Sequence, residues 1–268
     1  MRYANQTSSD DWAPFPAICY VIGAVLGDGH VCKQPKSGRY YVRLVVKDKS
    51  FAERFADALG QLGIKPHVCF YESCGMWAVV VYSKPFVGYL KRLDLNAVEA
   101  MCSTLDLVSA FIAGFYESEG YISIIKRSDR KGSWKPILSI GNTNLDLLRL
   151  AQRLLSSIGL TFHIYKQYDA KQMLISGRLV KRKTLYALTT QSALTAGRFF
   201  KIIRPCIKLP KIEIPNVNQR IAERSIVGGI SDELILKIKK LMAQGLSYKK
   251  IGSECGVSPS TVWRQDRQ

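Results

Sequence analysis

Two stretches of this chain carry an acidic residue in the same setting. In Val21–Gly29 and in Ile112–Gly120, a run of apolar and small residues ends in an acid followed directly by glycine. The acids are Asp28 and Glu119. If both runs are helices that pack against each other, the two carboxylates emerge side by side at the same end. A carboxylate pair of this kind is suited to binding a cation.

Small residues favour such packing. They recur four positions apart in each run, and residues at that spacing share one face of a helix. A face of small side chains lets two helix backbones approach closely. These residues are Gly23 and Gly27 in the first run, and Gly114 and Ser118 in the second.

The electrostatics of the expected site favour a divalent ion. Helix C-termini carry partial negative charge, and two neighbouring acids repel each other, so that one tends to keep its proton. A divalent cation compensates both effects. Oxygen ligands without nearby cysteine or histidine favour Mg²⁺, Ca²⁺ or Mn²⁺ over zinc. The alternative is that each run is a buried helix stopped by a glycine, with an unrelated acid before it.

The composition points to a polyanionic partner. Among 268 residues there are 39 Lys and Arg against 21 Asp and Glu, which gives a formal net charge of +18. The seven cysteines include no CxxC pair and there are only three histidines, so neither a disulfide framework, a zinc module nor a histidine-metal nuclease is expected. No apolar run approaches the ~18–20 residues that span a bilayer. We therefore expect an intracellular protein, not a secreted one, with no membrane partner.

The patterns of the two halves repeat, which predicts an α+β fold made of tandem αββαββα units. In the first half we expect strands at 39–47, 67–71 and 76–82, a helix opened by a Ser50 cap, and a helix at 85–93. In the second half we expect strands at 121–126, 136–140, 162–167 and 184–190, a helix from Asn144, and a helix at 193–203. The predicted domains are the halves 12–110 and 111–205, a Pro- and Gly-punctuated linker at 206–229, and a C-terminal domain at 230–268.

The C-terminal segment has the pattern of a helix-turn-helix. It contains two short apolar-periodic segments and then a glycine turn at Gly256, an N-cap at Ser258 and Pro259 at the first position of a third helix. That helix would lie in the DNA major groove. The residues best placed to reach base edges are Ser260, Thr261 and Arg264. A small helical bundle for protein contact is the alternative.

The paired motifs resemble those of the LAGLIDADG homing endonucleases, in the single-chain form with two motif copies, over about residues 12–205. The C-terminal segment resembles the helix-turn-helix of resolvase-like recombinases. The first resemblance implies a pseudo-two-fold saddle of two four-stranded antiparallel sheets over the DNA major groove. It also implies that Asp28 and Glu119 hold the metal, with the carbonyls of Gly27 and Ser118 as further ligands.

The implied activity is that of an intron-encoded, site-specific endonuclease. Its metals would activate water and stabilise the leaving 3′ oxygen in an in-line displacement, leaving a double-strand break with short 3′ overhangs. Mg²⁺ is the expected cofactor, Mn²⁺ is expected to substitute for it, and Ca²⁺ is expected to bind without supporting cleavage. The implied partner is double-stranded DNA with a long asymmetric target site, bound by a monomer.

The family also places a basic residue near each acid, at the end of a saddle strand. Lys49, with Asp48 beside it, is the best match in the first half. The second half has Asn142 and Thr143 where a lysine would stand, and Lys126 could approach from the neighbouring strand. This difference, together with Asp in one motif and Glu in the other, predicts unequal cleavage of the two strands.

The expected DNA contacts alternate along strands and crowd hairpins, where one face meets DNA and the other the core. In the first half they are Arg39, Tyr41, Arg43 and Lys47, and in the second half they are Arg127, Arg130, Lys131, Lys135, Arg178, Lys181, Arg182 and Lys183.

Two other functions stay open at this point. A DNA-binding transcriptional regulator of the WhiA type would have a degenerate LAGLIDADG core without cleavage, followed by a helix-turn-helix. An intron RNA maturase would bind structured intron RNA independently of the two acids.

Overall fold

The structure of the chain, a computed structural model, describes residues 12, 15–34, 38–126, 134–175, 178–210, 232–257, 259 and 262–263. The chain divides into two compact units, Met1–Glu213 and Ile214–Gln268. Each unit is described by itself.

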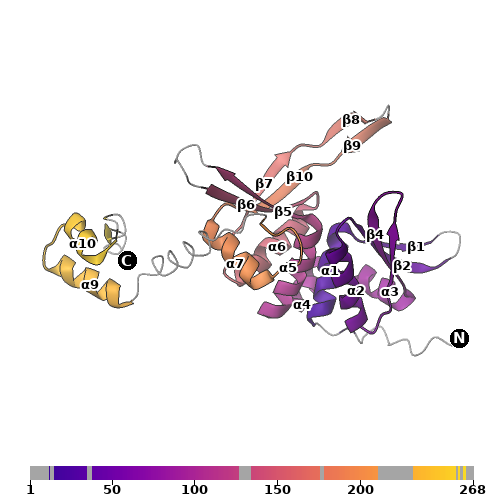
Figure 1. The fold of residues 1–268 in the computed structure, drawn as a ribbon, viewed down its shortest axis with the longest axis horizontal. Helices are drawn as coiled ribbons and strands as arrows, with labels where there is room; N and C mark the ends of the chain where they lie inside the picture. Colours follow the sequence, from indigo (N-terminus) through magenta and orange to yellow (C-terminus); the bar gives the residue numbers. More distant parts are fainter. Residues whose placement is uncertain are drawn as a thin grey trace. The chain divides into compact units, whose positions relative to one another are not determined.

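Two buried helices form the centre of the first unit, α1 (Pro16–Asp28) and α5 (Leu105–Glu119). They lie side by side (Figure 1) and are apolar nearly all round, as expected of helices without a solvent face. A Cβ atom on Gly23 would come within 3.0 Å of the Phe111 carbonyl oxygen, and one on Gly114 within 3.0 Å of the Tyr20 carbonyl oxygen. The close packing predicted from the small residues is therefore confirmed.

Each motif helix leads into a four-stranded antiparallel sheet. The first sheet has the order β1-β2-β4-β3, and the second has the order β5-β6-β10-β7. The strands of the first sheet are β1 (His30–Lys33), β2 (Tyr40–Val46), β3 (His67–Tyr71) and β4 (Met76–Tyr82). Those of the second sheet are β5 (Gly120–Lys126), β6 (Trp134–Asn142), β7 (His163–Tyr168) and β10 (Leu185–Thr190). The edge strands β1 and β5 begin directly after the motif helices, so both acids lie where a central helix passes into a sheet. The predicted α+β class with two antiparallel sheets is confirmed.

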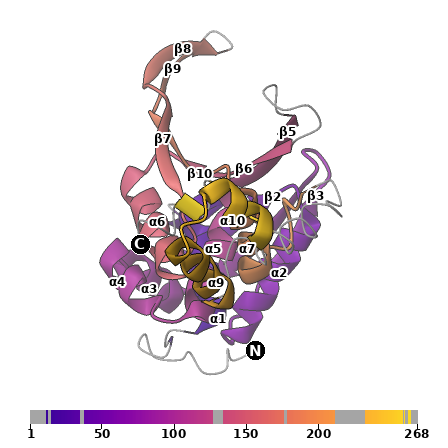
Figure 2. The ribbon, with the colours of Figure 1, turned by 90° about the vertical axis from the view of Figure 1, so that its left-hand side faces the viewer.

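Five amphipathic helices of the described first unit pack against the sheets and the motif helices (Figures 1 and 2). Their apolar faces are buried there. The helices are α2 (Lys49–Gln61), α3 (Lys84–Arg92), α4 (Leu95–Met101), α6 (Leu145–Ser157) and α7 (Ala193–Ile203). Phe51, Phe55 and Leu59 of α2 are fully buried, and the leucines of α6 form the matching face in the second half. One continuous core joins both halves.

The edge strand β1 was not predicted, because no strand was expected between the first motif and residue 39. Two further features of the first unit were not predicted either. One is the short helix α4, whose seven residues give too little periodicity to recognise, although Asp94 caps it by accepting the N–H of Ala97 at 2.7 Å. The other is a two-stranded hairpin, β8 (Lys171–Ile175) and β9 (Arg178–Arg182), inserted between β7 and β10. It extends outward from these strands in Figures 1 and 2.

The expected Ser50 cap is wrong. Helix α2 begins at Lys49, and its N-cap is Asp48, whose carboxylate accepts the N–H groups of Ser50 at 2.9 Å and Phe51 at 3.2 Å. A carboxylate one residue before the first turn satisfies two unpaired N–H groups and also interacts favourably with the helix dipole.

The second unit contains α9 (Asp232–Ala243) and α10 (Tyr248–Cys255). Ser247 caps α10, which ends at Gly256 in the left-handed conformation, with φ 66°. Ile238, Ile251 and Val262 form a fully buried cluster. Ser260, Thr261 and Arg264, the expected base-reading residues, lie outside the described residues.

Within the described ranges, none of the helices combines the length and the apolar character that crossing a membrane would require.

Candidate metal and nucleic-acid site

Asp28 and Glu119 are the last residues of the two motif helices. Each helix stops at a glycine in extended conformation, Gly29 with φ −77° and Gly120 with φ −81°. A Cβ atom at either position would come within 3.0 Å of the preceding helical turn, on Val25 or on the ring of Tyr116. Glycine is therefore needed here for close packing of the turn from helix to strand, and not for a left-handed cap.

The two acids act on each other. Burial, followed by the charge of Asp28, raises the pKa of Glu119 to about 7, whereas Lys208 and a hydrogen bond from Asn142 oppose the shift. Burial also raises the pKa of Asp28, again opposed by Lys208. Two carboxylates are thus held in a partly buried place where their ionised forms need a cation.

The donors present fit a hard divalent cation. Asp28 and Glu119 supply carboxylate oxygens, and Ser118, the residue before Glu119, supplies a backbone carbonyl oxygen. Oxygen donors of this kind are those that Mg²⁺ and Ca²⁺ prefer. In the described residues no cluster of three or more His, Cys, Asp or Glu side chains exists that could form an all-protein cage. Water and phosphate oxygens would have to complete the coordination of such an ion.

Asn142 is brought to this site by the end of β6. Its Nδ2 donates to Oε1 of Glu119 at 2.7 Å, and its Oδ1 accepts the N–H of Asn144 at 2.8 Å. The position at which a second lysine was sought therefore holds an amide that orients the acid.

Lys49 is placed differently from the expectation. Its Nζ pairs with Glu53 at 2.9 Å and lies 5.6 Å from the ring centroid of Trp77, and the side chain is 60% exposed. It is not among the charges that act on Asp28 or Glu119. The reason is the Asp48 cap, which makes Lys49 the first residue of α2 and directs it to the next turn. The Lys126 side chain lies outside the described residues.

Lys208 supplies the cation that was expected from Lys49. Its Nζ donates to the carbonyl oxygen of Ser118, and its charge opposes the rise in the pKa of both Asp28 and Glu119. Burial lowers the pKa of Lys208 itself, and the nearby carboxylates oppose this shift. Lys208 falls in the linker expected from the sequence at 206–229, and no periodicity or motif marks it.

Residues 204–208, which we call the strap, follow α7 and carry Lys208 to the motif helices. The buried carboxylate of Glu117 anchors the strap. It accepts the N–H of Cys206 at 2.6 Å, Nη1 of Arg54 at 2.5 Å and the hydroxyl of Tyr20. Glu117 is 1% exposed, and the guanidinium of Arg54 lies 4.8 Å from the centroid of the Tyr20 ring. A buried carboxylate is tolerated here because every contact supplies a donor or a cation.

Two carbonyl groups of the strap are also held. Nη1 of Arg54 donates to the carbonyl oxygen of Arg204 at 3.1 Å, and the hydroxyl of Tyr116 donates to the carbonyl oxygen of Lys208 at 2.9 Å.

Several of the expected DNA-facing residues lie on the face of β2 opposite the core or beside aromatic rings. On β2, Val42, Leu44 and Val46 are buried while Tyr41 and Arg43 lie on the opposite face, as the alternation predicts. Aromatic rings support several arginines: Arg39 lies 5.9 Å from the ring centroid of Tyr82, Arg43 lies 5.6 Å from that of Tyr71, and Arg182 lies 3.3 Å from that of Tyr168.

Other expected contacts are exposed or half-buried, namely Lys47, Lys135, Lys181 and Lys183. Arg127, Arg130 and Lys131 lie outside the described residues, as does the side chain of Arg178.

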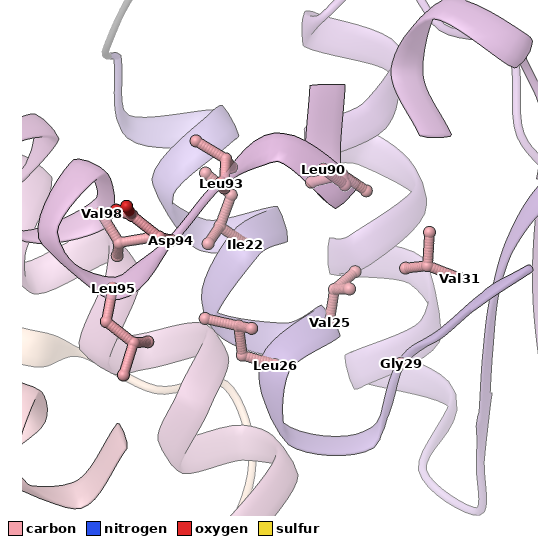
Figure 3. Close-up of a pocket in the computed structure, with 10 residues that line it drawn as sticks. All are labelled: Ile22, Val25, Leu26, Gly29, Val31, Leu90, Leu93, Asp94, Leu95 and Val98. Carbon is pink, nitrogen blue, oxygen red and sulfur yellow. The ribbon is translucent and has the colours of Figure 1, made fainter. Parts of the chain in front are cut away.

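A separate apolar cavity of about 270 Å³ lies between α1, β1, α3 and α4 (Figure 3). Ile22, Val25, Leu90 and Leu95 are among its lining residues. Its carboxylate, that of Asp94, is used as the cap of α4. The cavity therefore has no group free for chemistry among its lining residues.

Comparison with known proteins agrees with this architecture. A LAGLIDADG-like domain model matches residues 17–92 and 106–203, so the chain belongs to this family. The protein MJ0398 of Methanocaldococcus jannaschii is 29% identical over 168 residues, which cover 61% of this chain and 57% of that protein. The chain thus spans less than three fifths of the length of this curated relative.

Two kinds of solved structure are similar to this chain. The homing endonuclease I-DmoI in complex with DNA and Ca has a TM-score of 0.50 and 19% identity, over 76% of this chain and 97% of that chain. The N-terminal LAGLIDADG domain of DUF199/WhiA has a TM-score of 0.49 and 12% identity, over 78% of this chain and 91% of that chain. At 19% identity the likeness to I-DmoI is one of fold.

Proposed function

We propose that the chain is a site-specific, divalent-metal-dependent endonuclease that cuts both strands of a DNA duplex as a monomer. The observation that carries the proposal is the pairing of Asp28 with Glu119, in which the charge of one acid raises the pKa of the other at the ends of two tightly packed helices. An interaction that disfavours two ionised acids is retained most readily where a cation and a phosphate complete the site.

In this proposal Asp28, Glu119 and the Ser118 and Gly27 carbonyls hold the metal. A bound Mg²⁺ would neutralise charge on the scissile phosphate and favour attack by water. Asn142 fixes the orientation of the Glu119 carboxylate. Because no side-chain amide in the described part of the chain donates to Asp28, the two strands are expected to be cut at different rates.

The two sheets provide the DNA-binding surface. Arginines braced by aromatic rings on β2 and near β10, and lysines on the β8–β9 hairpin, suit contacts with phosphates over a long site. The hairpin is present in the second half and has no equivalent between β3 and β4, so the proposed target site is asymmetric. I-DmoI, which shares the fold, is described in complex with DNA and Ca.

The second unit is proposed to be a helix-turn-helix that lengthens the recognised site. It has two short helices, a Ser247 cap, a left-handed Gly256 and a small buried cluster. Removing residues after 225 should then shorten the protected footprint while leaving cleavage chemistry in place. An unchanged footprint would contradict this role.

One observation favours a second candidate function, a DNA-binding regulator without nuclease activity. The ammonium group of Lys208 already contacts the Ser118 carbonyl, where a metal was expected. If that contact is permanent, the fold binds DNA and does not cut it.

The experiment that separates the two functions uses a randomised duplex library incubated with the protein in Mg²⁺ or in EDTA. A nuclease yields new ends with short 3′ overhangs at a shared sequence in Mg²⁺ and none in EDTA. Enrichment of a bound sequence that is intact in both conditions would contradict the nuclease and support the regulator.

A further inference from the structure

We propose that Lys208 is a tethered counter-cation for the Asp28–Glu119 pair, which lets the metal-free protein bind DNA and which a divalent metal must displace. The inference concerns the same site as the proposed function and rests on it for the identity of the metal ligands. Its tests measure metal and DNA binding, and cleavage by the wild type serves only to separate its failure from that of the nuclease proposal.

The ammonium group of Lys208 lies at the end of the motif helix that carries Glu119. It donates to the carbonyl oxygen of Ser118, the residue before Glu119, and its charge acts on both Asp28 and Glu119. The hydroxyl of Ser118 points elsewhere, to the carbonyls of Ala24 and Gly114, both at 3.1 Å. The carbonyl of Ser118 is therefore the oxygen that the ammonium group and a metal would share.

The strap holds Lys208 in a defined conformation. Lys208 has φ 56°, a left-handed conformation that is unfavourable for a non-glycine residue. Tyr116 holds its carbonyl group, and Glu117 holds the N–H of Cys206 two residues before it. A surface lysine with no defined place would need neither the backbone conformation nor these anchors.

The positive charge of Lys208 also affects how DNA phosphates approach the two acids. Two ionised carboxylates at the centre of a DNA-binding surface repel the phosphates that must approach them. One fixed ammonium group cancels one of these charges without a metal. The same ammonium group competes with a divalent ion for the Ser118 oxygen and for the negative charge of the two carboxylates. Removing it should therefore tighten metal binding and weaken DNA binding in the absence of metal.

The test compares wild type, Lys208→Met, Lys208→Arg and Lys201→Met. Lys201 is exposed, lies on the last turn of α7 and provides a matched loss of one charge near the strap. Two quantities are measured: Mn²⁺ affinity, from the electron paramagnetic resonance signal of free Mn²⁺, and affinity for a duplex selected by binding to wild type, in EDTA and in Ca²⁺. Thermal unfolding checks that each variant is folded.

For Lys208→Met we expect Mn²⁺ binding to tighten about fivefold or more. We expect its DNA affinity in EDTA to fall about tenfold, with a smaller loss in Ca²⁺ because the metal replaces the missing charge. Lys208→Arg and Lys201→Met should stay within about threefold of wild type in both measurements.

Unchanged or weaker Mn²⁺ binding in Lys208→Met would overturn the inference. So would a Lys208→Arg variant that behaves like Lys208→Met, since the role would then be structural. If wild type cuts no DNA while Lys208→Met alone binds Mn²⁺, the inference holds and the nuclease proposal fails. If wild type cuts DNA but the Mn²⁺ affinities are equal, the nuclease stands and the inference fails.

Discussion

The carboxylate of Glu117 accepts the backbone N–H of Cys206 at 2.6 Å, which ties the strap to the end of a central motif helix. The same carboxylate pairs with Arg54 at 2.5 Å and is 1% exposed. One buried acid thus holds together α2, α5 and the segment that carries Lys208.

Glu117→Ala is expected to lower the free energy of unfolding by about 2–4 kcal/mol, because Arg54 and the Cys206 N–H lose their acceptor. Urea unfolding followed by circular dichroism measures this change. Glu53→Gln is the control, since Glu53 is an exposed acid paired with Lys49 on the same helix as Arg54, and its loss should cost less than about 1 kcal/mol. Equal effects of the two substitutions would contradict the anchoring role.

Gly23→Ala should destabilise the protein by about 1–3 kcal/mol, because its Cβ would press on the Phe111 carbonyl of the facing helix. Gly60→Ala is the matched control, because that glycine lies in α2 with open space around it and alanine is the better helix former. We expect Gly60→Ala to be neutral or to stabilise by up to about 1 kcal/mol in the same urea assay. A tolerated Gly23→Ala would contradict the close packing of α1 and α5.

Glu119 should make the metal-free protein less stable at higher pH. Its pKa is about 7 in the folded chain and near 4.5 when unfolded, so the folded state holds the proton more tightly. The resulting stabilisation is present below pH about 4.5 and is lost as the pH rises through 7. Glu119→Gln should therefore be more stable than wild type at pH 8 by about 1–2 kcal/mol after allowing for solvent screening, with little difference near pH 4.5.

Glu99 provides a control of opposite sign for the pH series. Arg153 lowers the pKa of Glu99, so Glu99→Gln should lose stability above pH 4.5 instead of gaining it. Adding Ca²⁺ should remove the advantage of Glu119→Gln at pH 8. A Glu119→Gln variant that is less stable than wild type at pH 8 without metal would contradict the raised pKa.

DNA affinity should fall steeply with salt, and Lys181→Gln should reduce the slope of log affinity against log salt by about one. Lys181 is exposed on the β8–β9 hairpin. The control is Lys91→Gln, which should leave the slope unchanged, because Lys91 is exposed on the last turn of α3, a helix that packs against β1 and β2. Fluorescence anisotropy at several salt concentrations measures both. Equal slopes for Lys181→Gln and wild type would show that the hairpin does not touch DNA.

The sequence predicted the acid pair because residues that face each other across two helices leave a local pattern. Gly23 and Gly27, like Gly114 and Ser118, are four positions apart, and this spacing indicates which faces of the two helices meet. The acid at the end of each run marks the helix ends at which the carboxylates lie. The sheets followed from alternation, as on β2, where Val42 and Leu44 are buried.

Lys208 could not be predicted in the same way. Its position depends on Glu117, a residue 91 positions earlier whose side chain looks like part of a motif and is in fact an anchor. Lys49 shows the converse: it matches a family position in the sequence, but in the structure it is the first residue of α2 and pairs with Glu53. Local pattern predicted the acid pair, whereas the position of Lys208 depends on tertiary contacts.

The central claim is that Asp28 and Glu119 together hold a metal for DNA cleavage. It is tested most directly by strand-resolved cleavage of a labelled duplex selected by binding in Ca²⁺, with wild type, Asp28→Asn and Glu119→Gln in Mg²⁺. The account predicts that wild type cuts both strands at unequal rates. It also predicts that each variant keeps its DNA affinity within about tenfold and loses at least about a hundredfold in double-strand product. Wild-type rates of double-strand cleavage in either variant would contradict it.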